Sequence, residues 1–154
     1  MKTIIEEFGW NAGKVWKTLS TKGPLKEEAL RQNTKLTGDE LWTAIGWLAR
    51  EGKICRENNL YKLGQTNLTP KIGVDAGKVW NTVARQGEVD ISTIAKLAQI
   101  TEVDAYQALG WLARENKVKL QKIKSKEPKI KSGSVELLSE NVHLGGMEAI
   151  GELA

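Results

Sequence analysis

The 154-residue sequence holds one cysteine, one histidine and three prolines, and it has no long uninterrupted apolar run. A lone cysteine, Cys55, cannot form a disulfide within the chain and is typical of a reducing cytoplasm. One histidine, His143, with one cysteine provides neither a metal cluster nor a nucleophile with its base. We therefore expect no enzyme, no metal and no cofactor. No stretch approaches the roughly 20 apolar residues of a membrane span, and residues 1–7 are unlike a signal peptide, so we expect a cytoplasmic protein without a membrane partner.

Charge is distributed unevenly along the chain, whose net charge is +4. Residues 132–154 contain four glutamates and neither lysine nor arginine, which leaves 23 basic and 15 acidic residues in 1–131, a balance of +8. A basic body suits an anionic partner, with an acidic tail that competes for it. Solvated surface charge without any partner is the alternative.

An internal repeat organises the sequence. Residues 8–55 align with 72–119 without a gap, at a constant offset of 64, and 17 of the 48 positions are identical. Two blocks hold most of this identity: Ala-Gly-Lys-Val-Trp at 12–16 and 76–80, and Gly-Trp-Leu-Ala-Arg-Glu at 46–51 and 110–115. A gap-free match of this length indicates the duplication of one small module.

Both copies begin with apolar residues at helical spacing, which predicts a first helix. Asn11 and Asp75 stand directly before these runs, in positions suited to N-caps. A shorter second helix is expected at 26–34 and again at 92–98. The amphipathic pattern of the first helix thus repeats in both copies.

A third helix and a hairpin complete each copy. Thr37 and Thr101 are expected to cap the third helices, each with an acid three residues later that can reach back to the cap. Two alternating runs around Asn58-Asn59 predict a hairpin, and residues 118–124 alternate in the same way. Three helices followed by a hairpin is the order of a winged helix-turn-helix.

The sequence therefore predicts a mainly helical α+β fold, a tandem winged helix-turn-helix with small β-hairpin wings. We expect a first module at 1–64, a linker at 65–71, a second module with a basic wing at 72–131, and an acidic, apolar tail at 132–154. Modules of about 60 residues are small for independent stability, so the two are expected to share a buried interface.

Tryptophan and glycine recur at equivalent positions of the two copies. Trp16 and Trp80, and likewise Trp47 and Trp111, are expected to pack in the core or between the modules. Gly13 and Gly46 are expected to let the first helix pack closely against the third. An anion held near the start of the first helix by Gly13 and Lys14, and by Gly77 and Lys78 in the second copy, is the alternative.

The two blocks resemble a small prokaryotic family of winged helix-turn-helix domains of unknown function. Its members begin with an Asn-Ala-Gly-x-Val-Trp helix and end the third helix with Gly-Trp-Leu-Ala-Arg-Glu, which residues 11–16 and 46–51 match. The second copy departs at Asp75, and the likeness stops before the tail. The resemblance implies the architecture and a general expectation of DNA binding, with no catalytic or ligand residues.

The outward face of the third helices is unusual for a DNA-binding helix. Glycine and aromatic residues dominate it: Trp42, Gly46 and Trp47, then Tyr106, Gly110 and Trp111. The residues on this face that could hydrogen-bond to bases are Thr43, Gln107, Arg50 and Arg114. This composition argues against sequence-specific recognition by the usual route and favours a surface that another protein approaches.

The strongest basic feature lies at 117–131, in and after the expected second wing. Seven lysines accompany one acid there: Lys117, Lys119, Lys122, Lys124, Lys126, Lys129 and Lys131. They could neutralise phosphates in a salt-sensitive manner that is independent of base sequence. A solvated edge strand that its lysines protect from aggregation is the alternative.

The leading prediction is a nucleic-acid-binding protein with double-stranded DNA as its partner. It would act in transcription regulation or in a chromatin-like role, mainly through phosphate contacts. The alternative is a protein-interaction or self-assembly module, which would bind a protein partner or form a homo-oligomer through the aromatic third-helix faces. The tail, with apolar residues between its acids, is expected to dock on such a face or to shield the lysine strip.

Overall fold

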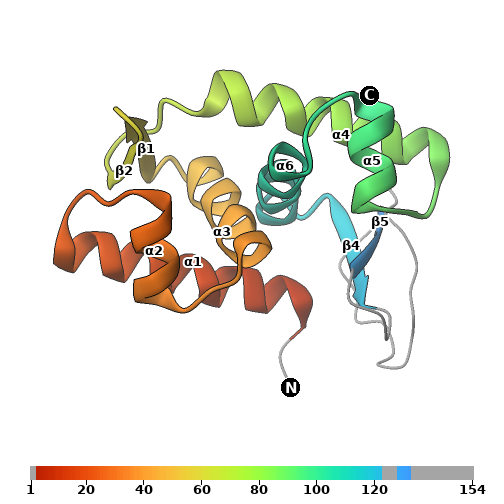
Figure 1. Ribbon diagram of the computed structural model, residues 1–154. Helices are drawn as coiled ribbons and strands as arrows, with labels where there is room; N and C mark the ends of the chain where they lie inside the picture. Colours follow the sequence, from red (N-terminus) through yellow and green to blue (C-terminus); the bar gives the residue numbers. More distant parts are fainter. Residues whose placement is uncertain (1–2, 123–127, 133–154) are drawn as a thin grey trace.

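The computed structural model describes residues 3–122 and 128–132 (Figure 1). The first module comprises α1 (Ile4–Lys22), α2 (Glu27–Thr34), α3 (Gly38–Arg50), β1 (Ile54–Glu57) and β2 (Leu60–Leu63). After the π-helical turn η1 (Thr69–Gly73), the second module comprises α4 (Val74–Gln86), β3 (Val89–Asp90), α5 (Ile91–Ala98), α6 (Glu102–Arg114), β4 (Val118–Lys122) and β5 (Pro128–Ser132). The expected order of three helices and a hairpin is confirmed in both copies.

Helix α1 begins well before Asn11. Thr3 is its N-cap: the Thr3 hydroxyl accepts from the Glu6 amide (3.0 Å), and the Glu6 carboxylate accepts from the Thr3 amide (2.9 Å). This capping box stabilises two extra turns, so Asn11 lies inside the helix and the expectation that it is the N-cap is wrong. The extra turns bring Trp10 onto the helix surface, where it is 61% exposed.

The start of α4 also differs from expectation, because η1 runs directly into it and no side chain caps it. Asp75, the expected N-cap, is buried and accepts a hydrogen bond from the Lys71 ammonium (2.8 Å). The same ammonium reaches the Asp104 carboxylate of α6 (3.0 Å). The hydrogen bond to Asp75 is the main cause that raises the pKa of Lys71. Asp75 therefore helps to hold the turn before α4 against α6.

The third helices begin as expected. Thr37 and Glu40 form a complete capping box at the start of α3. The Thr101 hydroxyl accepts from the Asp104 amide (3.0 Å) at the start of α6, but the Asp104 carboxylate accepts from Lys71 and forms no capping box, so the expectation that it reaches back to the cap is wrong. Local sequence therefore determined where both third helices start.

The two wings belong to different sheets. Strands β1 and β2 pair antiparallel, and Asn58 and Asn59 both have positive φ (52° and 66°), as a type I′ turn requires. A single bridge joins Tyr61 of this hairpin to Leu25. In the second module, β3 also pairs with the wing and gives a sheet of order β3-β5-β4. The hairpin predicted at Asn58-Asn59 is thus confirmed, and the second wing is part of a larger sheet.

The two modules share their cores. Ile4, Ile5 and Phe8, at the start of α1, pack against the core of the second module. Ile72, the equivalent of Phe8 in the repeat, is buried in the core of the first module. Helices α3 and α6 lie side by side between α1 and α4 (Figure 1). The buried interface expected from the small size of each module is confirmed.

Candidate functional site

Helices α3 and α6 approach each other at two glycines. A Cβ atom added to Gly46 would lie 1.8 Å from the carbonyl oxygen of Gln107. One added to Gly110 would lie 1.9 Å from the carbonyl oxygen of Thr43. These two positions are equivalent in the repeat, so the same close approach occurs twice. The surface that approaches Gly46 is therefore the other module of the same chain.

Thr43 and Gln107 lie inside this contact. Thr43 is 2% exposed, and its hydroxyl donates to the carbonyl oxygen of Glu40 (3.0 Å). Gln107 is 9% exposed and lies near Tyr61, whose pKa is raised mainly by burial. The helix face that would contact base edges is thus covered by the other module. The expected role of Thr43 and Gln107 in base contacts does not fit this burial.

Arg50 and Arg114 form reciprocal ion pairs across the same contact. Arg50 Nε donates to the carboxylate of Glu115 at 2.8 Å, and Arg114 Nε donates to that of Glu51 at 2.9 Å. Each arginine side chain is 46% exposed. The two pairs are related by the repeat, as in the isologous interface of a symmetric dimer. The structure therefore places both arginines, expected as base or phosphate ligands, in contacts between the modules.

The aromatic residues of the third helices also meet across this interface. Trp47 and Trp111 each lie beneath the arginine of the other module, with the guanidinium carbon 5.7 Å and 5.8 Å from the ring centroid. The rings of Trp42 and Tyr106 have centroids 5.9 Å apart. Each of the four side chains proposed as contacts for another protein thus contacts the other module of its own chain.

Exchanging Arg50 and Glu115 tests this interface. We expect Arg50→Glu and Glu115→Arg each to lower the free energy of unfolding by about 1 kcal/mol or less, because the pair is partly exposed. The double variant should recover at least half of the combined loss, since the opposite charges face each other again. Urea unfolding at low and high salt measures both quantities. Strictly additive losses in the double variant would show that the two side chains do not interact.

The register of the second wing places lysines opposite each other or opposite a neutral residue. Lys119 of β4 lies opposite Lys131 of β5, and Gln121 lies opposite Lys129. Like charges directly opposite each other destabilise an antiparallel ladder. An anion bound at this wing would remove that cost.

The other lysines of the strip have different positions. Lys117 is exposed and lies 3.4 Å from the Glu115 carboxylate. Lys122 is the last residue of β4. Lys124 and Lys126 lie outside the described residues. Five of the seven lysines therefore lie on or directly before the two strands of the second wing.

The first wing neutralises part of its own charge. Lys62 donates to the Glu57 carboxylate at 2.7 Å, which raises the pKa of Lys62. The Arg56 guanidinium carbon lies 5.2 Å from the centroid of the Tyr61 ring. The two wings share a fold but differ in the charge that they offer to a ligand.

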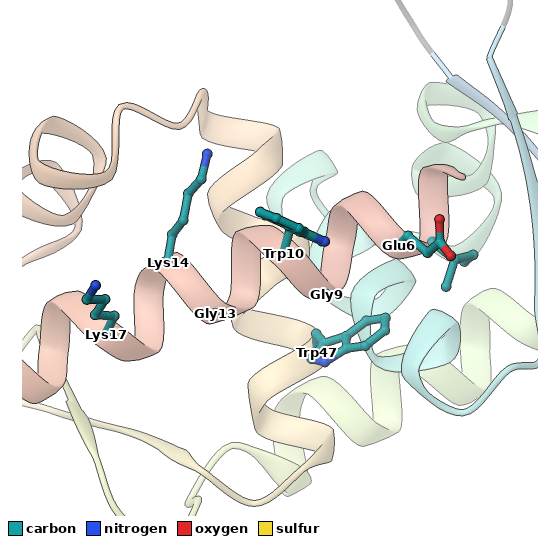
Figure 2. A pocket seen from close by; sticks show the side chains of 8 residues that line it. Glu6, Gly9, Trp10, Gly13, Lys14, Lys17 and Trp47 are labelled. Carbon is teal, nitrogen blue, oxygen red and sulfur yellow. The ribbon is translucent and has the colours of Figure 1, made fainter. Parts of the chain in front are cut away.

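A hollow of about 810 Å³ lies along α1 (Figure 2). Its lining is mainly apolar, with Glu6 at one end and two lysines at the other: Ile5, Glu6, Gly9, Trp10, Gly13, Lys14, Lys17 and Trp47. The sequence does not predict a functional position for Trp10, because the helix is expected to begin after Asn11. The spacing of positions 10, 13, 14 and 17, which places them on one helical face, is the signal that could have found it.

Trp16 and Gly13 do not pack as expected. Trp16 is 43% exposed. Gly13 is exposed too, and a Cβ atom added to it would meet no atom within 4 Å. The close contact of α1 with α3 involves Gly9 instead, where an added Cβ would lie 3.2 Å from the Trp47 ring. The earlier start of α1 again explains why Gly9 was overlooked.

Three further features bear on function. Within residues 3–122 and 128–132, no three His, Cys, Asp or Glu side chains are grouped as ligands for a metal ion. No helix in that part of the chain is long and apolar enough to cross a membrane. Cys55 is a free, buried thiol on β1.

Comparison with known proteins agrees with this architecture. Residues 1–64 and residues 66–131 each match the family described as winged helix-turn-helix domain (DUF2582). No curated protein and no solved structure matches the chain. Winged helix-turn-helix domains are typically nucleic-acid binders. Because the two matches cover most of the sequence, the chain belongs to this winged helix-turn-helix family and carries two copies of its domain.

Proposed function

We propose that this protein binds double-stranded DNA through the phosphate backbone, in a regulatory or chromatin-like role and without catalytic activity. The observation that carries the proposal is the burial of α3 against α6, which covers the usual recognition face and favours phosphate contacts from the lysine-rich second wing. Phosphate contacts position a protein on DNA but carry no base information. Binding is therefore independent of base sequence.

The charge of the second wing supports this proposal. Residues 117–131 carry seven lysines and one glutamate, whereas the equivalent hairpin at 53–63 carries three basic residues and one glutamate. The pairing of Lys119 with Lys131 concentrates positive charge at one rung of the ladder. A phosphate bound at this rung would offset the repulsion between the two positive charges. The second module therefore provides the main DNA contact.

A titration of the full chain with two duplexes of unrelated sequence tests the proposal. If the five lysines of the described wing each contact a phosphate, the affinity should fall roughly several-hundred-fold between 50 and 200 mM salt. The two duplexes should bind with affinities within about three-fold of each other, because phosphate contacts do not distinguish bases. Salt-independent binding, or a strong preference for one duplex, would contradict the proposal.

The alternative function, self-assembly through the third-helix faces, would need a surface that this chain already uses. Gly46 and Gly110 face the other module, and the flanking tryptophans lie against its arginines. A second copy could bind there only after α3 and α6 separate. Light scattering should therefore report a monomer at micromolar concentration, and a concentration-dependent dimer would favour the alternative.

A further inference from the structure

The hollow on α1 is lined by an exposed aromatic side chain and by two glycines, Gly9 and Gly13. Trp10 lies at the edge of the hollow and is 61% exposed. Trp47 of α3 lines the hollow beside Gly9. Figure 2 shows Trp10, Lys14 and Lys17 projecting from successive turns of α1. A large exposed apolar side chain beside an apolar hollow is typical of an interaction surface. The hollow is therefore a candidate docking site.

Gly13 strengthens this interpretation. The equivalent Gly77 on α4 is equally open, but Val74 stands there in the place of Trp10. No atom of the described residues lies within 4 Å of a Cβ placed at Gly13, so the helix surface beside Trp10 is open. A glycine at that position lets a bound segment contact the backbone of α1 directly.

The charge of the residues that line the hollow indicates what kind of segment can bind there. Lys14 and Lys17 lie on the same side of α1 and form no ion pair with any residue that the structure describes. Glu6, at the opposite end of the lining, is engaged in the capping box with Thr3. An apolar floor with two uncompensated ammonium groups fits a segment that carries both aliphatic and acidic side chains.

Residues 133–154 of the same chain have this composition. They carry Glu136, Glu140, Glu148 and Glu152, neither lysine nor arginine, and several aliphatic residues. Met147, Ile150 and Leu153 recur at three-residue spacing, with Glu148 and Glu152 between them. These residues lie outside the described part of the chain. We propose that the segment docks on α1, with aliphatic side chains in the hollow and glutamates beside Lys14 and Lys17.

The segment starts close enough to reach this site. It follows Ser132, which lies opposite Val118 at the start of β4, and β4 packs beside α1. A segment of 22 residues spans up to roughly 70 Å when extended. Because the two parts belong to one chain, the effective concentration of the segment at the hollow is in the millimolar range. Modest contacts therefore suffice to keep it bound.

Zero-length cross-linking of the full chain with a carbodiimide, followed by mass spectrometry, tests the docking. Amide links should join Lys14 or Lys17 to glutamates of 133–154 within a monomer. Their yield should exceed that from Lys78, the equivalent of Lys14 on α4, by about five-fold or more. The reason is that Val74 stands near Lys78 where Trp10 stands near Lys14. Trp10→Ala should lower the yield about three-fold or more without affecting folding, since its side chain is largely exposed.

Three results would each overturn the proposal. Links at Lys14 and Lys17 that occur only in covalent dimers would show that a second copy fills the hollow. Dominant links to the second-wing lysines would show that the segment covers that wing instead. Equal yields at Lys14, Lys17 and Lys78 would show that the segment has no fixed site.

A second measurement uses the nuclear magnetic resonance signal of the Trp10 indole N–H. The double variant Glu148→Lys with Glu152→Lys should shift this signal, and an unchanged signal would also contradict docking.

Discussion

Replacing Gly46 with alanine is expected to lower the free energy of unfolding by about 3 to 5 kcal/mol, and Gly110→Ala should have a similar effect. The new methyl groups would lie 1.8 Å and 1.9 Å from the carbonyl oxygens of Gln107 and Thr43. These oxygens belong to helix backbone, which cannot rotate away as a side chain can. Alanine gains only about 1 kcal/mol of helix propensity over glycine, so the clash dominates. Urea unfolding followed by circular dichroism measures the loss.

Gly77→Ala is the matched control for this experiment. Gly77 also lies inside a helix, but a Cβ atom added to it would meet no atom within 4 Å. We expect this variant to be as stable as the wild type, or up to about 1 kcal/mol more stable. If Gly46→Ala behaves like Gly77→Ala, α3 and α6 do not approach as described. Since that approach covers Thr43 and Gln107, the same result would also mean that these two side chains are accessible for base recognition.

The double variant Lys119→Gln with Lys131→Gln is expected to weaken duplex binding roughly ten-fold near 100 mM salt. The slope of log affinity against log salt should fall by about 1 for each lysine removed, because each neutralised phosphate releases its counterion. Folding should not suffer, since the substitution removes two like charges that lie opposite each other in the ladder. Fluorescence anisotropy with a labelled duplex at several salt concentrations measures both changes.

The first wing provides the control for that experiment. Lys53 and Lys62 each have a carboxylate partner within their own module, Glu51 and Glu57. Lys53→Gln with Lys62→Gln removes the same charge from the protein, yet it should change the affinity by less than about two-fold. An equal loss from both double variants would indicate that only net charge matters and that the second wing has no special role.

Much of the fold could be predicted because its signals are local. The constant offset of 64 residues revealed two copies, and one copy then supported the interpretation of the other. Thr37 and Thr101 mark the starts of α3 and α6, because a cap needs only residues within one turn. Asn58 and Asn59 specify the first hairpin through their own positive φ angles. Each of these features depends on neighbours in sequence.

The starts of α1 and α4 were predicted wrongly for two different reasons. Thr3 and Glu6 form a local capping box before α1, but they lie outside the repeat, which begins at Phe8 and gives no signal for them. At α4 the start depends on tertiary structure, since Ile72 is buried in the core of the other module and Lys71 contacts Asp104. Only the first of these errors could have been avoided from the sequence.

The sequence by itself determined the duplication, the order of helices and hairpins, and the glycines and tryptophans that both third helices share. It could not determine what those residues face. The spacing of Leu41, Ile45 and Leu48 identifies one buried side of α3, but a second buried side arises only when another helix covers it. The structure provides that helix as α6 and places Thr43 and Gln107 between the modules. Periodicity records contacts within a module, whereas contacts between modules depend on how the whole chain packs.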